Sequence, residues 1–285
     1  MLAAAPTATA GTFPGANGRI AYAANAGGAS QVFTMDARGG DRRQITHESA
    51  GAGHPDWSPD GRSLAYDIGG KWIGIAGADG SGQRVIQTEA DASDPSWSPD
   101  GSRLVFQSND YAPDGSVEDS SIYVVNADGT GLVRLGPGTE PVWSPDGGWI
   151  VFRSTPADSD LCPGIYAMRP DANDRHGVAP AYRDGDACDG GGSDPAFSPN
   201  GHRVVFVAPN GRDLFTVSVH GGTERRVRSD TQQKSSPVYS PDGREVLYST
   251  NAPEPTTRIV RLSLRARPRS IAPSFGELSW QPLAG

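Results

Sequence analysis

The chain has 285 residues, of which 37 are glycine and 24 are proline, and its formal net charge at pH 7 is −8. Acidic residues are spread along the sequence without a long basic block, which argues against a nucleic-acid backbone as the main partner. No apolar run approaches the roughly 18–20 residues that a membrane-spanning helix needs, and no window shows a sustained helical period.

The N-terminal residues 1–10, MLAAAPTATA, are small and uncharged. They resemble the small-residue end of a secretory signal, although the basic start and the full apolar core of such a signal are missing. We therefore expect residues 1–17 to be a flexible segment, either the remnant of a signal peptide or a disordered tail. We also expect an extracytoplasmic protein: periplasmic, in the cell envelope or secreted.

A short motif recurs along the rest of the chain: an aromatic residue followed by Ser-Pro-Asp-Gly, with Asn replacing Asp in one copy. The copies begin at Trp57, Trp97, Trp143, Phe197 and Tyr239, and a degenerate sixth copy begins at Trp280. The steps between these aromatic residues are 40, 46, 54, 42 and 41 residues. A period near forty residues is typical of one four-stranded propeller blade.

The motif predicts a hairpin. Proline presets φ for a tight turn, the short Asp or Asn side chain bonds to the local backbone, and glycine takes the left-handed conformation without steric cost. A β-branched and aromatic-rich run follows each turn and predicts a strand. These runs are Leu64–Tyr66, Leu104–Phe106, Ile150–Phe152, Val204–Phe206 and Val246–Tyr248. We interpret the motif as scaffold without a chemical role.

In chain order, Arg19–Tyr22, Gln31–Met35 and Arg42–Thr46 predict three strands of a blade that lacks its first strand. Complete blades are then expected from His54, Asp94, Glu140, Asp194 and Ser236 onward. The last run, Leu278–Trp280, predicts a first strand without a blade. Pairing this strand with the incomplete N-terminal blade would close a ring and hide two sheet edges. Residues 18–285 are therefore expected to form one domain.

The repeat resembles that of the TolB-type, WD40-like β-propeller family, and the resemblance covers residues 18–282. It implies an all-β, six-bladed β-propeller with four-stranded antiparallel blades, closed by the C-terminal strand. It also implies an extracytoplasmic location and a role in protein or ligand contacts.

The sequence predicts no catalytic residue. No G-x-S-x-G motif is present, and the histidines have no metal-ligand spacing. We expect a monomeric, non-catalytic module that binds another protein or a small ligand through the channel mouth and the long loops. The alternative, a metal-dependent lyase or hydrolase with its site over the central channel, remains open, because propellers host many functions.

One position in each repeat is a candidate for this binding. It lies three residues before the aromatic residue and is predicted to line the channel mouth. The residues there are His54, Asp94, Glu140, Asp194, Ser236 and Glu277. The four carboxylates among them could be satisfied by the local backbone, by a lysine or arginine of a partner, or by a divalent cation such as calcium, which takes several oxygen ligands.

The two longest departures from the repeat, Asn109–Ser120 and Thr155–Pro163, are candidate partner loops, with Tyr111 as an aromatic anchor. The only two cysteines, Cys162 and Cys188, lie in the same blade region. In an exported protein an even cysteine count favours a disulfide, so we expect these two residues to be bridged.

Overall fold

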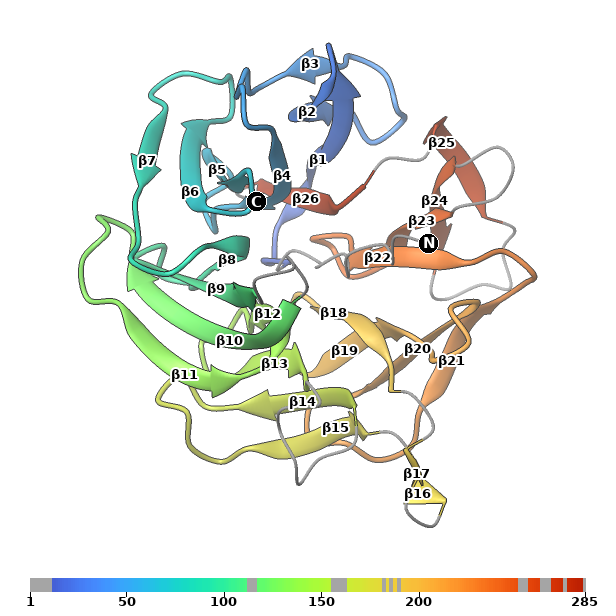
Figure 1. Cartoon of the computed structure of the whole chain (residues 1–285). Coiled ribbons are helices and arrows are strands. Elements are labelled where there is room, and N and C mark those ends of the chain that lie inside the picture. The colour runs from blue at the N-terminus through green and yellow to red at the C-terminus, as the bar shows by residue number, and fades with distance from the viewer. Residues whose placement is uncertain are drawn as a thin grey trace.

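The computed structural model describes residues 12–111, 117–154, 163–180, 183–184, 187–188, 191–250, 256–261, 268–273 and 276–283. The secondary-structure elements in these ranges are all β-strands. Four-stranded antiparallel sheets are arranged as a propeller around a central axis (Figure 1). In the described ranges there is no helix long and apolar enough to cross a membrane.

Six sheets of four strands are found in the described residues, and we number them around the axis. The first sheet contains β26 (Leu278–Leu283), β1 (Ala16–Ala26), β2 (Ala29–Met35) and β3 (Arg43–Gln44). The second contains β4 (Ala52–Trp57), β5 (Ser63–Ile68), β6 (Trp72–Gly77) and β7 (Arg84–Ile86). The third contains β8 (Ser93–Trp97), β9 (Arg103–Tyr111), β10 (Val117–Asn126) and β11 (Val133–Pro137).

The fourth sheet contains β12 (Thr139–Trp143), β13 (Ile150–Arg153), β14 (Gly164–Met168) and β15 (His176–Pro180). The fifth contains β18 (Ser193–Phe197), β19 (Arg203–Val207), β20 (Asp213–Ser218) and β21 (Arg225–Ser229). The sixth contains β22 (Lys234–Tyr239), β23 (Glu245–Thr250), β24 (Thr256–Arg261) and β25 (Arg269–Pro273). The short strands β16 (Arg183–Asp184) and β17 (Ala187–Cys188) pair with each other.

The recurring motif forms the turn between the first two strands of a sheet. In the copy at Trp57, Ser58 Oγ donates to Asp60 Oδ1 at 2.7 Å and accepts from the Ser63 amide at 3.0 Å. Gly61 has φ +68°, and a Cβ there would collide with the carbonyl oxygen of Pro282 in the neighbouring sheet. At this copy glycine is therefore needed both for the left-handed backbone and for close packing.

These turns define two edges of the molecule. We call the edge that carries them the turn edge, and the opposite edge, where the innermost strands β26, β4, β8, β12, β18 and β22 begin, the mouth edge. Each of these innermost strands contacts the corresponding strand of the next sheet around the axis (Figure 1). Residues near the start of the innermost strands are thereby gathered around one end of the channel.

The core is divided among the interfaces between neighbouring sheets. Each of the six buried apolar clusters joins residues of two adjacent sheets. The motif aromatic residues Trp57, Trp143 and Trp280 are among the largest fully buried side chains. The motif therefore contributes both the turn and the side chain that packs one sheet against another.

The C-terminal strand completes the first sheet, as expected from the unpaired first strand. β26 pairs antiparallel with β1, from Ala16 opposite Leu283 to Tyr22 opposite Leu278. Trp280 has no exposed surface, and its indole Nε1 donates to the carbonyl oxygen of Gly18 at 3.3 Å. Strands from the two ends of the described chain are thus held in one sheet.

The folded part of the chain begins earlier than residue 18. β1 starts at Ala16. Thr12 donates through Oγ1 to the carbonyl oxygen of Tyr239 at 3.2 Å. Phe13 is buried in the cluster between the second and third sheets. This short segment therefore bridges the sixth sheet to that cluster on the turn edge.

The insertion at Asn109–Ser120 is organised differently from a loop. β9 and β10 continue the ladder of the third sheet, and their last described pair is Tyr111 opposite Val117. Four consecutive polar residues, Gln107–Asp110, hide this extension in the sequence, because the apolar run that predicts the strand ends at Phe106. The remainder of the insertion, like residues 155–162 of the other one, lies outside the described residues.

Candidate functional site

The predicted channel-mouth residues share an unusual backbone. In the innermost strands of the second to sixth sheets, the residue three places before the aromatic one has φ between 47° and 55°. These residues are His54, Asp94, Glu140, Asp194 and Ser236. Each lies inside a register shift of its strand, which is a β-bulge. Left-handed backbone is unfavourable for residues other than glycine, so the surrounding contacts must hold each bulge.

Those contacts link neighbouring sheets. The amide of Asp194 donates to Glu140 Oε2 at 2.7 Å, and the amide of Ser236 donates to Asp194 Oδ2 at 3.1 Å. The amide of His54 lies 3.5 Å from Glu277 Oε2. In each case, the side chain of one sheet accepts from the bulge of the next sheet. The bulges therefore turn backbone donors toward carboxylates around the channel.

His54 is the cation in one half of this ring. Its Nδ1 lies 2.5 Å from Asp67 Oδ2, while its Nε2 lies 2.8 Å from Asp94 Oδ1 and 3.3 Å from Glu277 Oε1. Burial alone lowers the pKa of His54, but the charges of Asp94 and Glu277 outweigh burial and raise that pKa well above its ordinary value. The three carboxylates therefore favour the positively charged form of His54, which holds them together.

In the other half of the ring, no ion pair to Glu140 is present among the described residues. Glu140 is completely buried, and burial together with the charge of Asp194 raises the pKa of the Glu140 carboxyl well above its ordinary value. Arg153 opposes this shift through its charge. Burial also raises the pKa of Asp94, and the charge of His54 opposes that change. The ring is thus an acidic, partly desolvated site.

Three buried polar atoms near this second half have no hydrogen-bond partner among the described residues: Thr139 Oγ1, Glu140 Oε1 and Ser236 Oγ. Unsatisfied buried polar groups are uncommon in folded proteins. The described residues contain no group of three or more His, Cys, Asp or Glu side chains placed to hold a metal ion. The expected cation site at Asp94, Glu140, Asp194 and Glu277 stays a prediction.

A second set of polar residues beside the ring was not predicted from the sequence. Asp67, Gln107 and Arg153 come directly after the apolar run of the second strand, and they lie opposite residues that begin the innermost strands. Gln107 accepts from the amide of Glu140 at 2.9 Å. The sequence could have indicated these residues, because in several repeats a polar residue directly follows the aromatic residue that ends the apolar run of the second strand.

Tyr111 is 52% exposed at the mouth edge. It lines a groove of about 580 Å³ between the segment before β8 and the β9–β10 hairpin. The groove also contains the carboxylates of Glu89, Asp91 and Asp110, and a second tyrosine, Tyr123. This groove shares the mouth edge with the ring, because Ser93 at the start of β8 lies opposite Gln107 of β9.

The predicted disulfide cannot be placed. Cys162 lies outside the described residues, and only the backbone of Cys188, in β17, is described. The bridge between them stays a prediction.

Comparisons with known proteins agree with this architecture. TolB from Acinetobacter baumannii is 22% identical, with a TM-score of 0.74 over 93% of this chain and 67% of that one. A putative TolB from Agrobacterium tumefaciens is 18% identical, with a TM-score of 0.69 over 94% and 92% of the two chains. An oligogalacturonate lyase from Vibrio parahaemolyticus is 12% identical, with a TM-score of 0.61 over 94% and 79%.

No protein-family model and no curated protein matches this sequence. At these identities the structural likeness shows a propeller fold of the TolB-like kind, and it does not extend to activity.

Proposed function

We propose that this protein is a non-catalytic, TolB-like propeller that binds a basic segment of another protein at its mouth edge. The single observation that carries this proposal is the charge of the ring. Asp67, Asp94 and Glu277 contact one cation, His54. Glu140 accepts from the amide of Asp194, and no ion pair to Glu140 is present among the described residues. A lysine or arginine of a partner would satisfy this excess of carboxylates.

The adjacent groove supports the same class of partner. Carboxylates at Glu89, Asp91 and Asp110 offer ion pairs, while the rings of Tyr111 and Tyr123 offer surfaces for a cationic side chain. Tyrosine is common among residues that dominate binding energy at interfaces. The net charge of −8 would also attract a basic partner over longer distances.

We further infer six blades, because each four-stranded sheet has its own interface cluster with the next sheet. An extracytoplasmic location and a monomeric state belong to the same proposal. The TolB structures with this fold and the signal-like N-terminal residues 1–10 support the location. The pairing of β26 with β1 closes the first sheet within one chain, which supports a self-contained monomer.

A second candidate is a metal-dependent lyase or hydrolase over the channel. One fold neighbour is an oligogalacturonate lyase in complex with manganese, 14% identical with a TM-score of 0.62. Incubation with oligogalacturonate and manganese tests it. We expect no turnover, whereas turnover that disappears in Asp94→Asn would favour the enzyme.

The binding proposal is tested with a random peptide library displayed on phage. Immobilised wild-type protein should enrich peptides that carry lysine or arginine. The Glu89→Gln, Asp91→Asn, Asp110→Asn triple variant should lose this enrichment, because the groove then has no formal charge. Raising the salt concentration should weaken capture as well, since exposed charge pairs are screened.

A matched control removes three carboxylates from the turn edge. Asp79, Asp128 and Asp171 lie in the turns before the outermost strands of their sheets, and each accepts from the backbone of its own turn. Their triple Asn variant has the same net charge as the groove variant. Equal loss of capture in both variants would contradict a site at the groove, as would enrichment of peptides without basic residues.

A further inference from the structure

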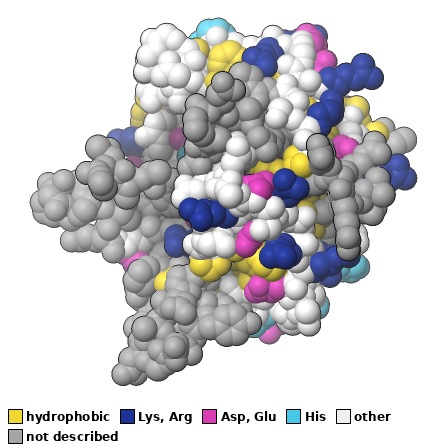
Figure 2. Space-filling model, turned by 90° about the vertical axis from the view of Figure 1, so that its right-hand side faces the viewer, with side chains coloured by type: hydrophobic (Ala, Val, Ile, Leu, Met, Phe, Trp, Pro, Cys, Tyr) yellow, Lys and Arg dark blue, Asp and Glu magenta, His cyan; other side chains and the backbone are white. Residues whose placement is uncertain are grey.

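A cavity of about 680 Å³ lies between the fifth and sixth sheets at the turn edge, on the opposite side of the molecule from the mouth. Three arginines line it: Arg203, Arg225 and Arg226. Its apolar walls come from Pro199, Val227, Tyr239 and Pro241. Figure 2 views the molecule from the side on which β20, β21 and β25 lie, and shows basic side chains beside hydrophobic ones there.

Arg203 is held in place at the base of this cavity. Its Nε donates to Thr216 Oγ1 and its Nη2 to the Thr216 carbonyl oxygen, both at 3.1 Å. Thr216 Oγ1 in turn lies 2.9 Å from the hydroxyl of Tyr239. The guanidinium is therefore oriented by Thr216 and Tyr239, and its five N–H donors exceed the hydrogen bonds that these two residues accept.

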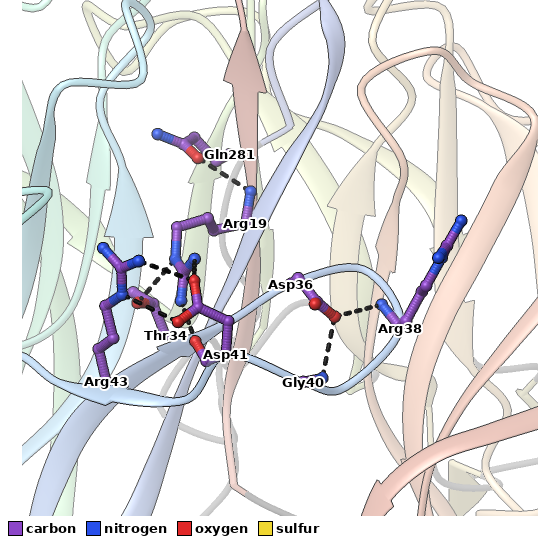
Figure 3. Close-up of polar contacts among 8 residues, drawn as sticks. All are labelled: Arg19, Thr34, Asp36, Arg38, Gly40, Asp41, Arg43 and Gln281. Carbon is purple, nitrogen blue, oxygen red and sulfur yellow. Dashed lines mark hydrogen bonds and ion pairs between the residues drawn. The ribbon is translucent and has the colours of Figure 1, made fainter.

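The first sheet contains the same arrangement with its acceptor present. Arg19 Nε donates to Thr34 Oγ1 at 3.0 Å, as Arg203 does to Thr216. Asp41 accepts from Arg19 Nη1 at 2.7 Å and from Arg43 Nη2 at 2.8 Å (Figure 3). These hydrogen bonds from Arg19 and Arg43 lower the pKa of Asp41. One carboxylate thus joins two arginines from different strands.

Strand register identifies the matching pair in the fifth sheet. Thr34 lies opposite Arg43, and Thr216 lies opposite Arg225. Arg203 and Arg225 therefore correspond to Arg19 and Arg43. The residue two places before Arg43 is Asp41, whereas the residue two places before Arg225 is Thr223. The carboxylate of the first sheet has no counterpart in the fifth.

Neighbouring acids do not take this place. Burial raises the pKa of Glu224, which is opposite to the effect of an ion pair with arginine. Asp242 lines the cavity, but its Oδ1 accepts from Ser240 Oγ at 2.6 Å and from the Arg244 amide at 3.1 Å within its own turn. No ion pair to Arg203 or Arg225 is present among the described residues.

An equivalent space between the second and third sheets differs from this cavity in volume and in charge. It measures about 460 Å³ and is lined by the corresponding motif residues, with Ser63 in the place of Arg203 and Trp97 in the place of Tyr239. Arginine does not line that space. The larger volume and the basic wall therefore do not follow from the shared motif alone, because the space between the second and third sheets has neither.

We propose that this cavity binds a small organic carboxylate. The carboxylate takes the position that Asp41 has in the first sheet and bridges Arg203 and Arg225, because the arginine fork matches carboxylate geometry. The body of the ligand lies against Pro199, Pro241 and the ring of Tyr239. The cavity volume is in the range of small-molecule sites, roughly 300–1,000 Å³. This site is separate from the mouth edge and from partner binding there.

The test is calorimetric titration with phenylacetate and with its uncharged analogue, phenylacetamide. We expect heat of binding from phenylacetate only, together with shifts of the Val227 methyl resonances in nuclear magnetic resonance spectra. Arg225→Gln should weaken binding roughly tenfold or more, since a charge-assisted hydrogen bond is lost. Arg225 is exposed, so this variant should fold normally.

Arg212→Gln is the control, because Arg212 is exposed and does not line the cavity. It should bind phenylacetate as the wild type does. Equal binding of phenylacetamide, unchanged affinity in Arg225→Gln, or the absence of binding heat would each overturn the proposal. Binding of phenyl phosphate without phenylacetate would overturn the assignment to a carboxylate.

Discussion

At the scale of single residues, we expect His54 to contribute strongly to stability through its ion pairs. Its imidazolium is in contact with Asp67, Asp94 and Glu277, from three different sheets. Its side chain keeps 22% exposure, so solvent screens these pairs only in part. Removal of the cation would leave three carboxylates facing one another in a partly desolvated channel.

We expect His54→Gln to lower the free energy of unfolding by about 3 kcal/mol, as for the loss of one partner of a buried ion pair. The pKa of His54 is raised in the folded state. Its contribution is therefore fully present below the ordinary histidine pKa of about 6.5 and is lost as pH rises through the folded-state value. Urea unfolding measured from pH 6 upward should show this decline in the wild type only.

Burial also raises the pKa of Glu140, so its contribution to stability is present below its ordinary pKa and is lost as pH rises through its folded-state pKa, in the wild type and the variant alike. If the free energy of unfolding of His54→Gln falls with pH as steeply as that of the wild type above pH 7, the decline does not come from His54.

The sequence placed one equivalent position near the start of each innermost strand, because the motif repeats and these strands begin at one edge. That the side chains there line the channel mouth stays a prediction. The sequence did not predict what these residues bind. The backbone amide of Asp194 donates to Glu140, and this amide is available because Asp194 lies in a left-handed bulge. A carboxylate residue in the sequence does not by itself predict a bulge. Asp67 was missed because its ion pair spans 13 residues and two strands.

At the scale of elements, the strand β26 shows how much one strand contributes. It supplies Trp280 to the cluster between the sixth and first sheets, where Ile20, Met35 and Leu247 also lie. Its residue Ser279 donates through Oγ to Asp56 Oδ1 at 3.3 Å in the second sheet. The strand is thus in contact with three sheets at once.

Trp280→Ala should lower the free energy of unfolding by about 3–5 kcal/mol, because a fully buried tryptophan leaves a large cavity. Leu283→Ala in the same strand is the control, since Leu283 is 42% exposed. Its effect should stay within about 0.5 kcal/mol. If the two substitutions lower the free energy of unfolding by similar amounts in chemical denaturation, burial of the Trp280 indole is not the main contribution of β26 to stability.

At the scale of the whole molecule, every sheet depends on two neighbours. The clusters join sheets pairwise around the axis, and the pairing of β1 with β26 leaves no interface of the ring open. A closed ring loses two interfaces, not one, when any sheet unfolds. We therefore expect unfolding to be a single cooperative event despite the chain length.

Deletion of residues 274–285 should abolish this cooperativity. The first sheet would keep β1, β2 and β3, with the edge of β1 unpaired and prone to association. Scanning calorimetry should give one sharp transition for the full chain, and a broad transition or an aggregated product for the truncated chain. A truncated chain that melts in one equally sharp transition would contradict closure as the source of cooperativity.

The register of that closing pair has a mechanical consequence. Ala16 at the start of β1 lies opposite Leu283 at the end of β26, so a tensile load on the two strands enters at the same edge of the ladder. Antiparallel strands pulled in this way unzip one residue pair at a time and do not resist in shear. The closed ring should therefore open at low force when it is pulled through Ala16 and Leu283.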